Sequence, residues 1–193
     1  ITRISNAACA AAQDGVRIII ISDRACNDRR APIPSLLAVG AVHRALVDAG
    51  LRRQVSVVVE SGDMREVHHL ACLIGMGAEA VNPWLALASV RAIAVDRQEV
   101  KGSKQSDGAD NEPTLSPAEL ADEAEHHYVH ALEKGLLKVM SKMGISTVDS
   151  YCGAQTFEVI GLSSDVSERC FANVPTRLGG HTMRQLAAMV LDQ

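Results

Sequence analysis

The pattern of hydrophobic and polar residues in the first half of the chain alternates between strands and helices. Residues 17–23 and 54–61 are nearly continuous β-branched runs, which are typical of strands buried on both faces of a parallel sheet. Between them, residues 35–50 carry apolar side chains at helical spacing, with Pro34 before the first turn and Gly50 at the stop position. The pattern therefore predicts a strand, a helix and a strand.

The next segment continues this alternation. Asp63 and Glu66 have the spacing of a capping box, which predicts a helix over residues 64–77, and residues 77–83 predict a short third strand. Helical crossovers between parallel strands predict an α/β fold of partial (β/α)-barrel units of the TIM type. A doubly wound nucleotide-binding sheet is the other option, but no G-x-G-x-x-G or Walker motif follows a strand.

A long helix is predicted in the second half of the chain. Ser116, Pro117 and Glu119 combine a helix cap, a proline at the first helical position and a capping-box partner. The helix is predicted to continue to Met143, where Gly144 suits the left-handed position that follows a helix.

The residues after this helix predict a strand, a polar turn and a last helix. The run 145–151 is rich in Ile, Thr, Val and Tyr, which strands favour. Small and polar residues follow at 152–155, the kind of position where barrel enzymes keep their chemistry. Residues 163–180 predict a loop-rich connection, and Thr182 with Gln185 predicts the start of the last helix.

Composition and charge narrow the function classes. The chain has 193 residues, of which 47% are hydrophobic and 22% charged, as in an ordinary globular protein. Only 3% are aromatic and the net charge is −4, which disfavours a stacking platform for single-stranded nucleic acid and attraction to polyanions. No apolar run approaches the ~20 residues of a membrane-spanning helix. We expect no nucleic-acid or membrane partner, and a location in the cytoplasm or an organelle lumen such as the plastid.

The charge is unevenly distributed along the chain. Residues 1–95 contain ten basic and eight acidic side chains, whereas residues 96–127 contain three and nine. The segment 96–116 is rich in Gly, Ser, Asp and Pro, and predicts an exposed acidic linker between residues 1–95 and residues 117–193. The last helix has no Gly or Asn to close it, so we expect the chain to be part of a longer polypeptide.

Several side chains could carry chemistry but have a simpler interpretation. The five cysteines are widely spaced without a C-x-x-C pair, which argues against a disulfide framework or a zinc site. His126 and His130 stand one helical turn apart, and we interpret them as part of a solvated helix face rather than as metal ligands. Asp23 and Glu60 end two strands; they could form a catalytic pair, but we interpret them as ion-pair partners of Arg24 and Arg65.

Two long stretches resemble the glutamate synthase family. Residues 31–52 and 57–86 resemble the end of its central domain. Residues 134–162, which contain the patterns S-K-M-G-I-S and S-Y-x-G-A-Q-x-F-E, and residues 170–180 resemble the opening of its FMN-binding synthase domain. The resemblance implies the end of a central barrel-like domain before the linker, and the start of the synthase barrel after it.

The resemblance implies an activity for the parent protein. Members of the family convert glutamine and 2-oxoglutarate to glutamate, with ammonia channelled between sites and an imine reduced by FMN. The family also has a 3Fe-4S cluster, whose cysteine ligands are expected outside this chain. The implied partners are the two substrates, the rest of the same polypeptide, and a small electron-transfer subunit or ferredoxin; the electron donor, NADPH, NADH or ferredoxin, stays open. The chain alone is expected to be inactive.

The resemblance also implies contacts with FMN, while metal ligands and catalytic residues are not assigned. The residues that match the family patterns are Ser141, Lys142, Ser150, Tyr151, Gln155 and Glu158. Each also has an ordinary interpretation: a solvated helix face, a satisfied hydroxyl or a polar turn. Two alternatives stay open for the whole chain, a non-catalytic barrel spacer or assembly module, and a piece of an unrelated (β/α)-barrel enzyme.

Overall fold

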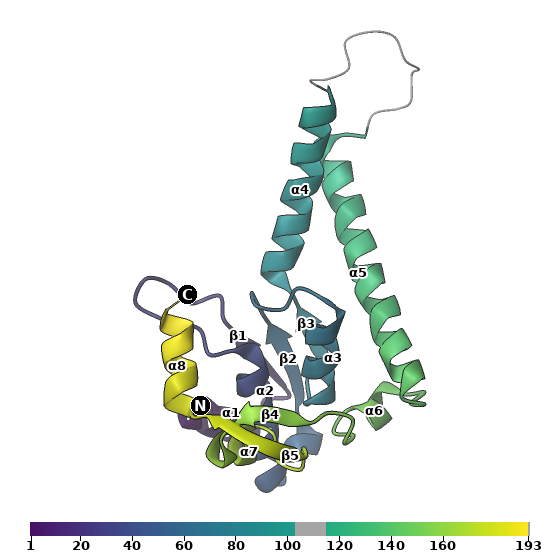
Figure 1. Cartoon of the computed structure of the whole chain (residues 1–193). Coiled ribbons are helices and arrows are strands. Elements are labelled where there is room, and N and C mark those ends of the chain that lie inside the picture. The colour runs from purple at the N-terminus through teal and green to yellow at the C-terminus, as the bar shows by residue number, and fades with distance from the viewer. Residues whose placement is uncertain (103–114, 193) are drawn as a thin grey trace.

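The computed structural model contains two small parallel sheets, helices packed around them, and two long helices that rise away from both sheets (Figure 1). It describes residues 1–102 and 115–192, with side chains for 1–97 and 115–192. The helices are α1 (Thr2–Gln13), α2 (Ser35–Asp48), the 3-10 helix η1 (Arg52–Gln54), α3 (Val67–Gly75), α4 (Trp84–Gly102), α5 (Pro117–Lys142), α6 (Val148–Tyr151), α7 (Ser164–Cys170) and α8 (Met183–Leu191). The strands are β1 (Ile18–Ser22), β2 (Ser56–Glu60), β3 (Ala80–Asn82), β4 (Val159–Leu162) and β5 (Thr176–His181).

The first sheet has the order β1-β2-β3, and all of its pairs are parallel. The three strands and the helix between the first two confirm the predicted α/β alternation. Val57 and Val59 on one face are fully buried, whereas Ile18 and Ile20 on β1 are 61% and 62% exposed. The expectation that these strands are buried on both faces is therefore wrong for β1, because the described part of the chain covers only one face.

Helix α2 is buried on two opposite sides. Val42 and Leu46 pack with residues of β2 in one apolar cluster, which also includes part of α1. Leu37 and Ala41 lie on the other side and pack with α7 and β4 in a second cluster. A helix at a protein surface buries only one stripe, so α2 acts as a central layer between the two sheets.

The second sheet consists of β4 and β5, which pair in parallel with irregular register and are joined by α7. Every residue of β5 is exposed, and Ile160 on β4 is 64% exposed. The loop predicted over residues 163–180 is therefore wrong, because α7 and most of β5 lie in it. Short elements with few apolar residues give weak periodicity, and here Val166 and Cys170 stabilise α7 by packing against α2.

Helices α4 and α5 form an antiparallel arm that projects from the sheets (Figure 1). The predicted capping box is present: the Ser116 hydroxyl accepts from the Glu119 N–H, and the Glu119 carboxylate accepts from the Ser116 N–H. The helix ends as predicted, with Gly144 at φ 72°. The base of α5 packs on α3, where a side chain at Gly135 would overlap Val67.

The structure also bears on the strand predicted after α5 and on the linker predicted before it. The strand predicted over residues 145–151 is wrong, because Thr147 caps the short helix α6 instead: its hydroxyl accepts from the Ser150 N–H at 3.4 Å. The linker predicted over 96–116 is only partly described, since α4 continues to Gly102 and residues 103–114 lie outside the described residues. In the described parts of the chain, no helix is long and apolar enough to cross a membrane.

Candidate functional site

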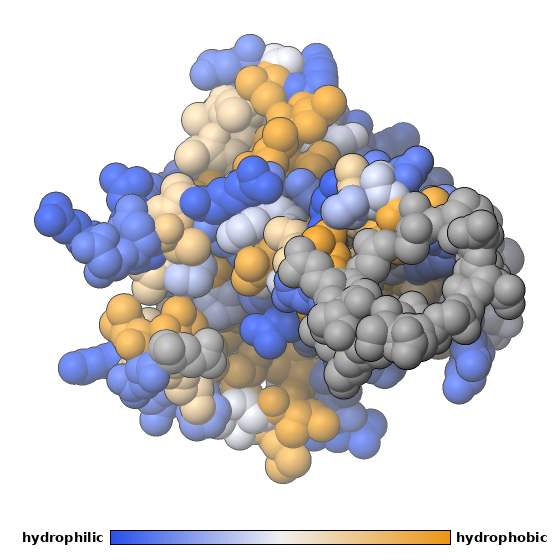
Figure 2. Space-filling model, turned by 90° about the horizontal axis from the view of Figure 1, so that it is seen from above, coloured by the Kyte–Doolittle hydropathy of each residue, from blue (hydrophilic) through white to orange (hydrophobic). Residues whose placement is uncertain are grey.

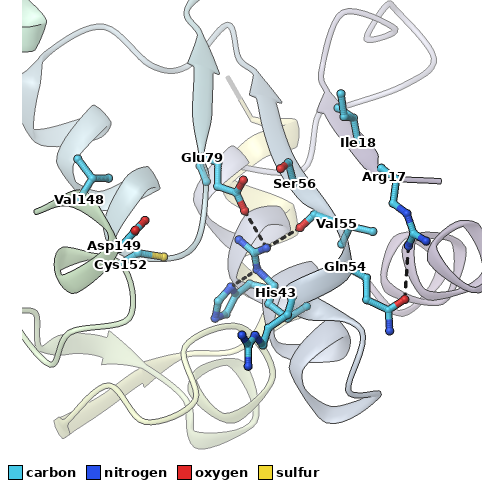
Figure 3. A pocket seen from close by; sticks show the side chains of 13 residues that line it. Arg17, Ile18, His43, Gln54, Val55, Ser56, Glu79, Val148, Asp149 and Cys152 are labelled. Atoms are coloured by element: carbon cyan, nitrogen blue, oxygen red, sulfur yellow. Dashed lines mark hydrogen bonds and ion pairs between the residues drawn. The ribbon is translucent and has the colours of Figure 1, made fainter. Parts of the chain in front are cut away.

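A broad cavity of about 1110 Å³ opens at the edge where the strands of the first sheet begin (Figure 3). Its lining combines basic and acidic groups, among them Arg17, Arg53 and Asp149, with the thiol of Cys152. Such a mixture of titratable groups in a hollow is a reasonable first candidate for an active site. Its chemistry depends on which of these groups are free.

Arg52 dominates this cavity and has no free nitrogen. Its Nε donates to Nδ1 of His43 at 3.0 Å, and its Nη2 donates to the carbonyl oxygen of Gly77 at 3.0 Å. Its Nη1 donates to the carbonyl oxygen of Val55 at 2.8 Å and pairs with Oε1 of Glu79 at 2.9 Å. Figure 3 labels three of these partners, His43, Val55 and Glu79. Arg52 thus ties α2, η1 and the start of β3 together.

The pKa shifts of the groups around Arg52 favour a structural role for them over a role in acid–base catalysis. Burial, with the charge of Arg52, lowers the pKa of His43, so its imidazole is neutral with Nδ1 as the acceptor. Burial opposes ionisation of Glu79, but hydrogen bonds from Ser56 and Arg52 and the Arg52 charge outweigh it and lower its pKa. Burial raises the pKa of Cys152, which keeps the thiol protonated and weakly nucleophilic.

The opposite edge, where the strands end, is also filled with paired groups. The Glu60 carboxylate accepts from Ser22 Oγ at 2.6 Å and from Asn82 Nδ2 at 3.4 Å, and it pairs with Arg24 Nε at 3.1 Å. The carboxylate at the end of the central strand β2 therefore accepts from both neighbouring strands. Of the two strand-end carboxylates expected to pair with Arg24 and Arg65, Glu60 pairs with Arg24. The expectation is wrong for Arg65, which pairs with neither carboxylate in the described chain, and for Asp23, which accepts from neutral donors instead.

Asp23 is held in the same way by backbone and ring donors. Its carboxylate accepts from the Gly62 N–H at 2.6 Å and from Trp84 Nε1 at 2.7 Å. The Arg24 guanidinium lies over the Trp84 ring at 5.1 Å from its centroid. These contacts fix the first residue of α4 to the sheet, so Asp23 anchors the arm and is not available as a general base.

Asp63 serves α2 rather than its own helix. Its Oδ2 accepts from the Ser35 N–H at 3.0 Å, and Ser61 Oγ donates to its Oδ1. The capping box predicted with Glu66 is therefore wrong: α3 begins only at Val67 and has no side-chain cap. Asp63 instead supplies an acceptor to the start of α2, whose own N-cap residue is a proline without one.

The structure places three of the residues predicted to contact FMN in two separate settings. Ser141 and Lys142 are exposed at the end of α5, where the Ser141 carbonyl accepts from the Gly144 N–H. Tyr151 is fully buried, and its hydroxyl donates to the carbonyl oxygen of Ala71 at 3.0 Å. Burial, aided by Cys72, raises the pKa of Tyr151 to about 12.

The other three residues also have protein partners. Ser150 Oγ accepts from Thr147 Oγ1 at 2.8 Å. Gln155 Nε2 donates to the Asn173 carbonyl oxygen at 3.0 Å, and the exposed Glu158 pairs with Arg177 at 3.4 Å. No hydrogen bond or ion pair joins any two of the six residues in the described chain. Their role towards FMN stays a prediction.

Sequence reasoning did not single out Arg52, His43 or Trp84 as organising residues. The available signal for Arg52 was its place between a helix stop and a strand, and Trp84 is the single tryptophan of the chain. Within the part of the chain that the structure describes, no three or more His, Cys, Asp or Glu side chains gather in a way that could hold a metal ion.

The sequence of this chain is similar to those of glutamate synthases. A family model described as the glutamate synthase central domain matches residues 1–163. The large chain of the NADPH glutamate synthase of Bacillus subtilis is 45% identical over 177 residues, which cover 92% of this chain and 10% of that protein. The ferredoxin-dependent glutamate synthase of Cyanidium caldarium is 41% identical, covering 93% of this chain and 11% of that protein.

The fold of this chain resembles part of a larger solved structure. A solved structure of a flavocytochrome b2 variant with sulfite bound has a similar fold, with a TM-score of 0.52 at 15% identity, covering 92% of this chain and 40% of that one. The family match runs through the predicted boundary at residue 117, and the domain division stays a prediction. This chain, which spans about a tenth of the length of the curated relatives that it matches, belongs to the glutamate synthase family.

Proposed function

We propose that this chain is a structural part of a glutamate synthase, a spacer that holds neighbouring parts of a larger polypeptide in place. The proposal rests on one observation: the charged side chains at both ends of the strands of the first sheet are bound to other protein groups. The carboxylates Asp23 and Glu60 at the strand ends, and Arg52 at the strand starts, have their polar atoms engaged by protein groups. Barrel enzymes need free acid–base groups at the strand ends, and these carboxylates are committed.

The polypeptide that contains this chain is proposed to form glutamate from glutamine and 2-oxoglutarate. Family membership supports this reaction, and the names of the relatives include NADPH-dependent and ferredoxin-dependent enzymes. FMN, when bound, would supply hydride for reducing the imine formed from ammonia and the keto acid. A 3Fe-4S cluster would pass electrons to it from NADPH, NADH or ferredoxin.

The described residues do not fit the cluster, and two of the residues predicted to contact FMN are already engaged. A cluster needs several closely spaced thiolates, and the described cysteines form no such group. The Tyr151 hydroxyl and the Gln155 amide already bond to backbone carbonyls. We therefore propose that FMN and the cluster bind elsewhere in the polypeptide. The alternative is that Gln155 and Glu158 contact FMN, which their exposure favours.

The open sheet faces support a partial-barrel architecture. Ile18 and Ile20 on β1, and Ile160 and Leu178 on the second sheet, expose more than half of their surface although they lie on strands. Parallel sheets are normally covered on both faces. We propose that further strands of the same polypeptide close these faces into (β/α)-barrels.

The test uses the full-length protein. Wild-type enzyme should form glutamate from glutamine and 2-oxoglutarate with one of the three electron donors, and absence of this activity would contradict the proposed reaction. Gln155→Ala and Glu158→Ala should leave the flavin content and the rate of glutamate formation unchanged. Arg52→Ala is the structural comparison, with a lowered melting temperature. Loss of flavin from Gln155→Ala or Glu158→Ala at unchanged melting temperature would favour direct FMN contact and overturn the spacer proposal.

A further inference from the structure

Helix α5 carries two exposed histidines at a spacing of one helical turn. His126 and His130 are one turn apart on the arm, both are exposed, and their rings are parallel to within 4° with centroids 6.4 Å apart. Residues four positions apart on a helix share one face, and two histidines at this spacing can hold one metal ion. Because both side chains are exposed, they can turn without disturbing the core.

Carboxylates surround this pair. His130 Nδ1 lies 3.8 Å from Glu133 Oε2, so Glu133 can orient the ring and leave Nε2 free for a ligand. On the other side, Asp122 and Glu125 line the same hollow as His126. A carboxylate beside a metal-binding imidazole fixes its tautomer and raises its basicity.

The local charge favours a cation. Four carboxylates of α5 lie between residues 122 and 133, and Arg91 of α4 pairs with two of them, at 2.6 Å to Asp122 and 2.7 Å to Glu125. Glu123 and Glu133 contact only histidines among the described residues. Even with Lys134 one turn after His130, these side chains leave a net negative charge on this stretch of the helix, which attracts a divalent ion.

We propose that His126 and His130 bind one borderline transition-metal ion, of the Cu²⁺, Ni²⁺ or Zn²⁺ class, through a ring nitrogen of each imidazole. Water fills the remaining positions, because no third His, Cys, Asp or Glu converges on the pair in the described residues. Imidazole ligands favour these ions, with Cu²⁺ bound most tightly, over Mg²⁺ and Ca²⁺. The pair lies on an exposed helix face, as the sequence predicted, and the proposal adds a ligand to that face.

The experiment is calorimetric titration of the untagged chain with Ni²⁺, with Mg²⁺ as a negative control. We expect one Ni²⁺ per chain, and His126→Ala and His130→Ala should each weaken binding by at least roughly tenfold, since even outer-shell changes at metal sites cost that much. His68→Ala is the control, because His68 is also an exposed histidine but lies on another helix, α3. It should bind Ni²⁺ like the wild type.

The substitutions at His126 and His130 should remove the ligands without unfolding the helix. Alanine favours helices more than histidine does, so circular dichroism should show unchanged helix content, and His126→Gln provides a second variant that keeps a polar side chain. Binding should weaken on acidification, because protons compete for the imidazoles. The proposal is overturned if the chain binds no Ni²⁺, if His126→Ala and His126→Gln bind like the wild type, or if His68→Ala loses binding equally.

Discussion

The Cβ atom that an alanine would add at Gly40 overlaps the backbone carbonyl oxygen of Cys170. Gly40 lies on α2 and Cys170 ends α7, so the missing side chain lets two helices from distant parts of the sequence approach closely. The same contact region includes Leu37 and Ala41 of α2. The packing of the second sheet unit on the first therefore depends on a glycine at this position.

Gly40→Ala should destabilise the chain by about 1–3 kcal/mol, because a carbonyl oxygen of the backbone cannot rotate away as a side chain can. Gly179→Ala is the control, since no heavy atom lies within 4 Å of a Cβ there, and it should change the stability by less than about 0.5 kcal/mol. Urea unfolding of both variants measures the difference. Equal midpoints would mean that α2 and α7 do not pack as described.

Acidification should destabilise the fold through His43. Its pKa is lowered in the folded state from the ordinary 6.5, first by burial and then by Arg52. The folded chain thus binds fewer protons than the unfolded chain, so this contribution is present above about pH 6.5 and is lost as the pH falls through the folded pKa. Melting temperatures at roughly pH 7.5 and pH 5 test it. His43→Gln should show a smaller drop, and an identical drop would exclude His43 as the source.

Alkaline conditions should reveal the buried phenol. Tyr151 has a pKa raised to about 12, mainly by burial and also by Cys72. Tyr128→Phe leaves Tyr151 as the single tyrosine, so the ultraviolet absorbance of its phenolate can be titrated alone. The folded pKa lies above the unfolded one, so the stability contribution is complete below about pH 10 and is lost as the pH rises towards about 12. A midpoint near 10 in the folded chain would show that Tyr151 is not buried.

Removing the Asp23 carboxylate, which anchors the arm, should lower the stability of the fold. Asp23→Ala leaves the Trp84 indole N–H and the Gly62 N–H without their acceptor, at an expected cost of about 1–3 kcal/mol. Trp84 is the single tryptophan, so its fluorescence spectrum should change in this variant.

Asp28→Ala is the matched control for the anchor. The Asp28 side chain is 84% exposed and lies 3.9 Å from Arg29, its sequence neighbour, so its loss should leave both the spectrum and the stability almost unchanged. A spectrum that Asp23→Ala does not alter would contradict the hydrogen bond to the indole.

Several elements of the fold could be predicted because their sequence signals are local. Strands β1 and β2 are continuous β-branched runs, and α5 begins with a complete capping box. Each of these signals involves residues within a few positions of one another, and no distant partner competes for the same side chains.

The incorrect predictions involve partners far apart in sequence. Asp63 looked like the cap of the helix that follows it, yet it caps α2, whose first residue Ser35 precedes it by 28 positions. The run 145–151 has strand composition, but Thr147 caps a helical turn and Tyr151 enters the core beneath α3. Local propensity was overruled by tertiary contacts in both cases.

The candidate site was predicted less well than the fold, for a related reason. Residue types at strand ends indicate where chemistry could be, but only the partners show whether a group is free. Glu60 and Asp23 are suitable acids by type, but they accept hydrogen bonds from Asn82, the last residue of β3, and from Trp84, which begins α4. The pairing that removes them from catalysis becomes visible only once the three strands lie side by side.

The double burial of α2 also bears on dissection of the chain. Leu37 and Ala41 are held by α7 and β4, while Val42 and Leu46 are held by β2. If a protease cut the polypeptide between α4 and α5, the first piece would contain α2 and β2, and the second would contain α7 and β4. Both pieces would still pack against α2. They should migrate together as a non-covalent complex, and neither piece expressed alone should reach a native state without the other.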